Sequence, residues 1–166
     1  MNKPTNEREW TALPNVDTAC FGCGAENPHG LGMKFESNGE RLRSRLTIHP
    51  HFRGWSNLVH GGVLSTILDE IMAWTVISLT GKFMLTKGMS VEFKKPVRVG
   101  AQLIANGFIR EHKGERRVVA IGQIFDEHGE LCASSEGEFV LFTKEQFLRM
   151  GIMPQEDIDA MSAAVF

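Results

Sequence analysis

Cysteine is scarce in this chain of 166 residues, which has only Cys20, Cys23 and Cys132. Three cysteines are too few, and odd in number, for a disulfide framework. An excess of one charge is also missing, because 18 Lys and Arg oppose 20 Asp and Glu. The net charge of -2 gives no general attraction to nucleic acid, so we predict no nucleic-acid partner. An anionic ligand would have to bind a local basic cluster.

Long uninterrupted apolar runs are missing as well. Residues 59–79 form the most apolar stretch, but it contains Asp69 and Glu70, so we predict no membrane span and no membrane partner. Residues 1–8 are polar and carry both charge signs, unlike a secretory signal. We therefore expect a cytoplasmic location. A hydrophobic content of 42% is ordinary for a soluble globular protein, and the length fits one domain.

The chain pattern changes from irregular to strand-like, then to helical, then back to strand-like. Residues 1–30 are rich in proline and glycine, and residues 33–48 alternate around an Asn38-Gly39 turn, which predicts a hairpin. Apolar residues at three- and four-residue spacing predict one buried helix over residues 59–79. Four further strands are predicted at 87–97, 101–112, 116–126 and 131–143, with short helices after residue 144.

The order of these elements predicts the fold class. Short gaps between successive strands favour antiparallel neighbours, because a parallel connection needs about a dozen residues or more. A single sheet must bury one face, and the helix at 59–79 is the only sizeable element available to cover it. We therefore predict an α+β fold with a curved antiparallel sheet wrapped around one long central helix.

The sequence His60-Gly61-Gly62 directly precedes the helical period, and Asp69 follows two turns later. Free backbone N–H groups at a helix start favour negative charge, and glycine lets a ligand approach them closely. Such donors suit a carbonyl oxygen that becomes an oxyanion during acyl transfer. The alternative is that the glycines only permit a tight turn and that Asp69 faces water.

Three motifs resemble the hotdog-fold acyl-CoA thioesterases of the phenylacetic-acid-pathway type. They are His60-Gly61-Gly62 with Asp69 nine positions after the histidine, a Phe-x-x-Pro-x-x-x-Gly pattern at 93–100, and an Asp-x-x-Gly-x-Leu pattern at 126–131. The resemblance covers residues 31–143. It implies a hotdog domain over 31–143, an irregular leader over 1–30 and a helical tail over 144–166.

The resemblance also implies roles for single residues. Asp69 would act as nucleophile or as general base for water, and the Gly61 N–H would bind the thioester oxygen with Gly62 as the neighbouring donor. His60 would orient the substrate or the loop. In such enzymes the helix start comes from one subunit and the carboxylate from the other, so a homodimer or a dimer of dimers is implied, with acyl-CoA as substrate and no cofactor.

The chain departs from the family pattern at two positions. Some relatives carry Gln six residues before the histidine, where this sequence has Gly54, and Ser or Thr four residues after the acid, where it has Ala73. We consider Asn57 and Thr66 as substitutes, with Thr75 as a further alternative. Without such a partner the choice between nucleophile and general base stays open.

Two groups of basic residues are candidates for binding the phosphates of coenzyme A. The alternative is that they are solvent-exposed residues at strand edges, where lysine discourages aggregation between sheets. The residues are Lys94, Lys95, Arg98, Arg116 and Arg117. Glu70 lies about 100° around the helix from Asp69, so we predict a structural or interface role for it.

Cys20-x-x-Cys23, with His29 as a third ligand, is half of a zinc pattern. A structural zinc site normally takes four protein ligands, so we favour a packed leader and predict no metal.

Three functions fit these residues. The first is hydrolysis of an acyl-CoA thioester through Asp69 and the helix start. The second keeps the fold but changes the reaction to hydration or dehydration of an acyl thioester. The third is a non-enzymatic acyl-CoA-binding module, which the missing polar partners at Gly54 and Ala73 favour.

Overall fold

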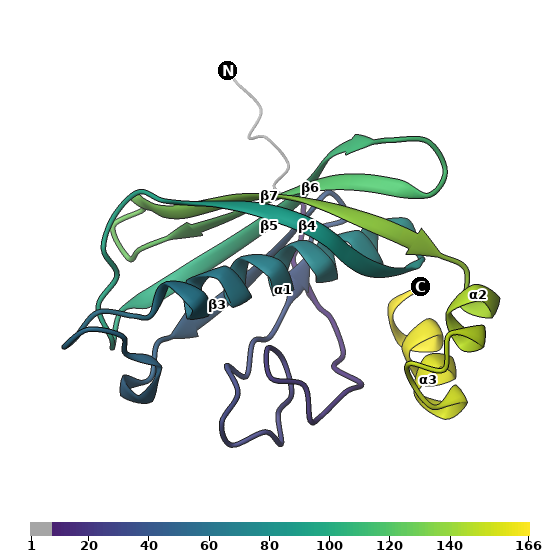
Figure 1. Cartoon of the computed structure of the whole chain (residues 1–166), viewed down its shortest axis with the longest axis horizontal. Helices are drawn as coiled ribbons and strands as arrows, with labels where there is room; N and C mark the ends of the chain where they lie inside the picture. Colours follow the sequence, from purple (N-terminus) through teal and green to yellow (C-terminus); the bar gives the residue numbers. More distant parts are fainter. Residues whose placement is uncertain (1–7) are drawn as a thin grey trace.

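The computed structural model describes residues 8–166 (Figure 1). The sequence prediction for residues 1–8 therefore lies, except for Arg8, outside the described residues. The strands are β1 (Thr11–Ala12), β2 (Glu36–Ser37), β3 (Arg41–Thr47), β4 (Phe83–Phe93), β5 (Gln102–His112), β6 (Arg117–Phe125) and β7 (Leu131–Phe142). The helices are the 3-10 turn η1 (Pro50–Phe52), α1 (Gly61–Thr80), α2 (Lys144–Arg149) and α3 (Gln155–Val165).

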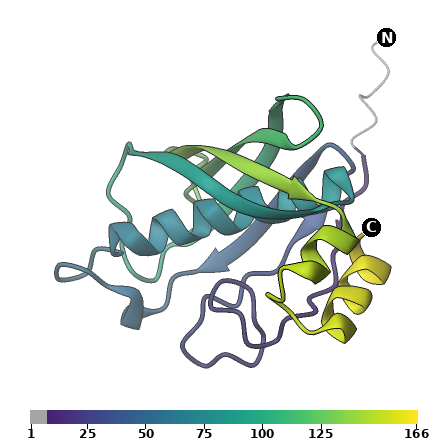
Figure 2. The same cartoon turned by 45° about the vertical axis from the view of Figure 1, so that its right-hand side comes forward.

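The seven strands form one sheet in the order β1-β2-β3-β5-β6-β7-β4, and every pair is antiparallel. The sheet arches over α1, which contacts the five strands β3 to β7 (Figures 1 and 2). This is the predicted curved sheet around a central helix. The predicted α+β hotdog architecture is confirmed.

Helix α1 has an identifiable start and end. The His60 side chain caps the first turn, and Gly81 ends the helix in the left-handed region at φ 62°. Glycines in the sheet let α1 lie close, because a Cβ atom at Gly107 would lie 2.2 Å from the Thr75 hydroxyl oxygen. Thr75 is fully buried and donates to the Ile71 carbonyl, so the suggestion that Thr75 reaches a ligand pocket is wrong.

Strand β4 differs from its prediction in position and in pairing. It begins at Phe83 and ends at Phe93, before the Lys95-Pro96 bond that disfavours further pairing. It pairs with β7 at one edge of the sheet and not with β5, its successor in the chain. Residues 94–101 instead carry the chain past the start of α1, where the Val59 N–H donates to the Val97 carbonyl. The expectation that short gaps join adjacent strands is therefore wrong for this connection.

The N-terminal leader and the C-terminal helices pack against the main body of the fold. Strand β1 pairs with β2, and Cys23 and Met33 belong to the main core cluster. Helices α2 and α3 form a smaller core with Phe83, through Phe147 and Ile158. The division at residues 30 and 143 stays a prediction.

By length and composition alone, α1 would qualify as a membrane span, with a mean hydropathy of 1.4. The sequence expectation that no segment qualifies is therefore corrected. More than half of its most apolar window is buried against protein, which is how the core helix of a sheet-wrapped fold is expected to look.

Candidate active site

The start of α1 holds one free backbone donor. His60 has extended geometry, with φ -63° and ψ 134°, and its Nδ1 accepts the Gly62 N–H at 2.9 Å. The prediction of Gly62 as an oxyanion donor is therefore corrected, because that N–H already has an acceptor. The Val63 and Leu64 N–H groups donate to the His60 carbonyl. Among residues 8–166, no acceptor takes the Gly61 N–H, which leaves it for a ligand.

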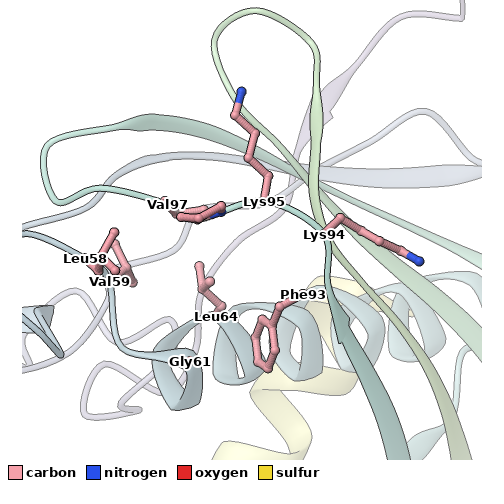
Figure 3. A pocket seen from close by; sticks show the side chains of 9 residues that line it. Leu58, Val59, Gly61, Leu64, Phe93, Lys94, Lys95 and Val97 are labelled. Atoms are coloured by element: carbon pink, nitrogen blue, oxygen red, sulfur yellow. The ribbon is translucent and has the colours of Figure 1, made fainter.

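An apolar cavity of about 250 Å³ lies beside Gly61 (Figure 3). Its lining residues are Leu58, Val59, Gly61, Leu64, Phe93, Lys94, Lys95, Pro96 and Val97. The Phe93 ring lies against Gly61, within 3.3 Å of where a Cβ atom would stand, and 55% of Phe93 is exposed. The free N–H and an apolar space thus meet at the helix start.

Asp69 lies two turns further along α1 and faces the edge strand β4. It is partly buried, and the Thr86 hydroxyl donates to its Oδ1 at 2.9 Å. Burial raises the pKa of the Asp69 carboxyl, and the bond from Thr86 opposes part of that rise. A carboxylate with raised proton affinity, held by one hydrogen bond, suits a general base.

Thr86 is the polar partner of Asp69 that the sequence analysis missed. The predicted strand began at residue 87, so Thr86 fell in a connecting segment. The two predicted substitutes are occupied elsewhere, because Asn57 Oδ1 accepts from Arg98 at 2.8 Å and the Thr66 hydroxyl donates to the Gly62 carbonyl at 2.9 Å. Neither is bonded to Asp69. The signal that could have identified Thr86 is a hydroxyl-bearing residue on the strand nearest to Asp69.

Gly61 and Asp69 cannot act on one carbonyl group within a single chain. Eight residues of α-helix separate them, which is ~12 Å along the helix axis. An oxyanion donor and a general base must both lie within hydrogen-bond reach of the reacting group. Gly61 and Asp69 of one chain are therefore too far apart to act on the same carbonyl group.

Comparison with known proteins points to one family. The sequence profile of the thioesterase superfamily matches residues 56–133, which include the helix start, Asp69 and Thr86. Over these residues the chain is similar to the thioesterase superfamily. The predicted resemblance is thereby confirmed at the level of the superfamily and its fold.

The individual proteins to which the chain is similar are distant in sequence. It is 24% identical over 121 residues to the acyl-coenzyme A thioesterase THEM4 of Bos taurus, covering 70% of this chain and 49% of that one. The chain thus spans about half the length of the curated relative it matches.

The solved structures share the fold. The thioesterase superfamily protein RHA08564 has a TM-score of 0.67 at 25% identity, covering 83% of this chain and 68% of that chain. The E. coli PaaI protein from the phenylacetic acid degradation operon has a TM-score of 0.61 at 20% identity, covering 68% and 80%. A hypothetical thioesterase protein of Streptococcus pneumoniae, solved with coenzyme A, has a TM-score of 0.59 at 21% identity, covering 63% and 80%.

The basic group nearest the helix start, Lys94, Lys95 and Arg98, is mostly neutralised. Lys94 pairs with Glu92, and Lys95 pairs with Asp126 at 2.7 Å and with Glu130. Figure 3 shows both ammonium groups pointing away from Gly61.

Arg98 is the exception in this group. It is exposed, and its guanidinium donates to the neutral side-chain amide of Asn57 at 2.8 Å. No carboxylate of residues 8–166 lies within ion-pair distance of it. Of the three predicted phosphate-binding residues near the helix start, Arg98 is therefore the one whose charge is not already paired with a carboxylate.

The second basic group lies at the other end of the sheet. Both groups can be located by their partners on β7. The Lys94 backbone N–H donates to the Cys132 carbonyl, whereas Arg117 pairs with Val140, eight residues further along that strand. That spacing is ~26 Å of strand. Arg116 and Arg117 therefore do not lie at the Gly61 cavity of their own chain.

Glu70 points away from Asp69, as its position on the helix predicts. It faces the leader, where its Oε1 lies 4.0 Å from the Cys20 Sγ, and Cys23 is part of the same cluster. His29, the third zinc ligand considered from the sequence, is not part of that cluster.

Proposed function

We propose that this protein hydrolyses acyl-CoA thioesters at a site built from two copies of the chain. The observation that carries the proposal is the free Gly61 N–H at the mouth of an apolar cavity. One copy supplies this donor, and its partner supplies the carboxylate of Asp69. The exposed edge strand β4, which carries Thr86 next to Asp69, offers unpaired backbone groups for a second copy.

The proposed reaction uses these groups in sequence. The Asp69 carboxylate takes a proton from water while the water oxygen adds to the thioester carbon. The Gly61 N–H binds the oxyanion, which collapses and breaks the C–S bond. The proton held by Asp69 then passes to the leaving thiolate, which gives a carboxylic acid and free coenzyme A. Direct attack by Asp69 is the alternative, and it would form an acyl anhydride on the enzyme.

The choice of coenzyme A rests on the superfamily and on the local chemistry. The S. pneumoniae neighbour was solved with coenzyme A, and a Streptococcus mutans neighbour was solved with acetyl-CoA. In this chain an apolar cavity, a free oxyanion donor and the arginine Arg98 lie close together in the fold. A thioester with an apolar acyl group and a phosphorylated carrier matches those three features.

The direct test is thiol release from a panel of acyl-CoAs of increasing chain length, read with a colorimetric thiol reagent. We expect at least one acyl-CoA to release one thiol and one carboxylic acid per turnover. Binding of coenzyme A without thiol release from any member would instead indicate a non-enzymatic binding module. Loss of the enoyl absorbance of an enoyl-CoA, without release of thiol, would indicate a hydratase.

Arg98 provides a prediction about substrate binding. We expect Arg98→Ala to raise KM for acyl-CoA by about tenfold, because a charge-assisted hydrogen bond to phosphate is worth roughly 1.5–3 kcal/mol. The same variant should leave KM unchanged for an acyl thioester of N-acetylcysteamine, which carries no phosphate.

Lys95→Ala is the matched control for Arg98→Ala. The Lys95 ammonium already pairs with Asp126 and Glu130, so the KM of this variant for acyl-CoA should change little. An equal rise in KM for the two variants, or a rise with the phosphate-free thioester, would contradict the assignment of Arg98.

A further inference from the structure

The N-terminal leader forms a partly buried side-chain cluster with α1 that the proposed hydrolysis does not use. The Cys20 and Cys23 sulfurs and one oxygen of Glu70 all lie within 4.8 Å of one another. The cysteines come from the turn at residues 20–24, and the carboxylate comes from the middle of the helix. A cavity of about 150 Å³ adjoins all three residues.

The backbone of the leader is shaped around Glu70. A Cβ atom at Gly22 would lie 2.3 Å from the Glu70 Cδ, so only glycine lets the carboxylate reach the turn. The turn itself closes through the Gly24 N–H, which donates to the Cys20 carbonyl at 2.9 Å. The same packing that holds the leader against α1 therefore holds the three donor groups together.

The cluster is acidic and has no cation of its own. Within residues 8–166, no Lys, Arg or His lies within ion-pair distance of Glu70. Two thiols and one carboxyl group thus face one another in a partly buried site, an arrangement that a divalent cation would stabilise.

We propose that Cys20, Cys23 and Glu70 bind one zinc ion per chain, with water as the fourth ligand. Thiolate and carboxylate are ordinary zinc ligands, at about 2.3 Å for sulfur and 2.0–2.2 Å for oxygen. A tetrahedron with those bond lengths separates its ligand atoms by about 3.3–3.8 Å. The Cys20 Sγ and the Glu70 Oε1 lie 4.0 Å apart, slightly wider than this, and all three ligand atoms lie within 4.8 Å of one another.

The zinc ion would attach the leader to the central helix. Two ligands lie in the leader and the third lies 47 positions after Cys23 on α1. This ligand set differs from the sequence expectation, which considered His29 as the third ligand and predicted no metal. Glu70 is not adjacent to either cysteine in the sequence, so only the fold brings it to them.

Cobalt substitution in the reduced full-length chain tests the site without reference to activity. We expect one equivalent of Co²⁺ to bind, with sulfur-to-cobalt charge-transfer absorption in the near ultraviolet and the intense visible bands of four-coordinate cobalt. One equivalent of Zn²⁺ should abolish both. Absence of these bands, or the weak spectrum of six-coordinate cobalt, would overturn the proposal.

Variants assign the ligands. Cys20→Ser and Cys23→Ser should each lose charge-transfer intensity. Glu70→Gln keeps the side-chain shape and should weaken Zn²⁺ affinity at least tenfold, because loss of an outer-shell partner alone costs 10- to 100-fold. Unchanged affinity in Glu70→Gln would overturn the assignment.

His29→Ala and Cys132→Ala are the controls, since neither residue belongs to the cluster. Both should bind cobalt as the parent chain does. Far-ultraviolet circular dichroism on every variant separates a lost ligand from a lost fold. A loss of binding in His29→Ala with its fold intact would contradict the ligand set.

Discussion

Replacing Asp69 with Asn is expected to lower kcat for acyl-CoA hydrolysis by about 10²-fold or more. General acid–base catalysis by one positioned group contributes typically 10²- to 10⁴-fold, and Asn cannot accept the proton from water. Steady-state thiol release measures the loss. KM should change little, because the substitution removes a group that acts in the transition state and leaves the cavity beside Gly61 intact.

The fold should survive Asp69→Asn. The amide oxygen of Asn can still accept from the Thr86 hydroxyl, and the substitution removes a partly buried charge whose pKa is already raised by burial. We expect a melting temperature equal to or above that of the parent chain. A well-folded variant with the full rate of thiol release would refute the role of Asp69.

Replacing Gly61 with Pro is expected to lower kcat by about 10²- to 10³-fold, the usual cost of one oxyanion-hole donor. Proline removes the N–H and adds a ring, and the first position of a helix is where proline is best tolerated. His60 already has the extended backbone, at φ -63° and ψ 134°, that a residue before proline requires. Circular dichroism should show an unchanged helix content.

Gly61→Ala is the matched control because alanine adds a methyl group but keeps the N–H. Its Cβ would lie 3.3 Å from the ring of Phe93, which is largely exposed and free to shift. We expect Gly61→Ala to keep kcat within about tenfold of the parent chain. Equal losses in the proline and alanine variants would mean that the space beside Gly61 matters and its N–H does not.

The sequence was sufficient to predict features that depend on local periodicity. The apolar spacing over residues 59–79 predicted the core helix, and the turn signals predicted three consecutive strands that the structure places side by side as β5, β6 and β7. His60-Gly61-Gly62 and Asp69 were found because both lie on one helix at a fixed spacing. Information of this kind is carried by neighbouring residues.

Features that depend on pairing between distant segments were not predictable in the same way. Strand β4 pairs with β7, about 50 residues later, so neither its edge position nor the contact of Thr86 with Asp69 follows from spacing. The loss of Gly62 as a donor depends on the His60 rotamer. The contact between Glu70 and the leader depends on the backbone path of the leader, whose sequence has no periodic apolar pattern.

The central claim is that one chain supplies Gly61 and its partner supplies Asp69. Two inactive variants, Asp69→Asn and Gly61→Pro, can be co-expressed with different affinity tags, and the heterodimer isolated by two successive affinity steps. A site shared between subunits leaves one of the two sites intact, so the heterodimer should recover about half of the parent kcat per dimer. A site contained within one chain leaves no intact site, and an inactive heterodimer would contradict the claim.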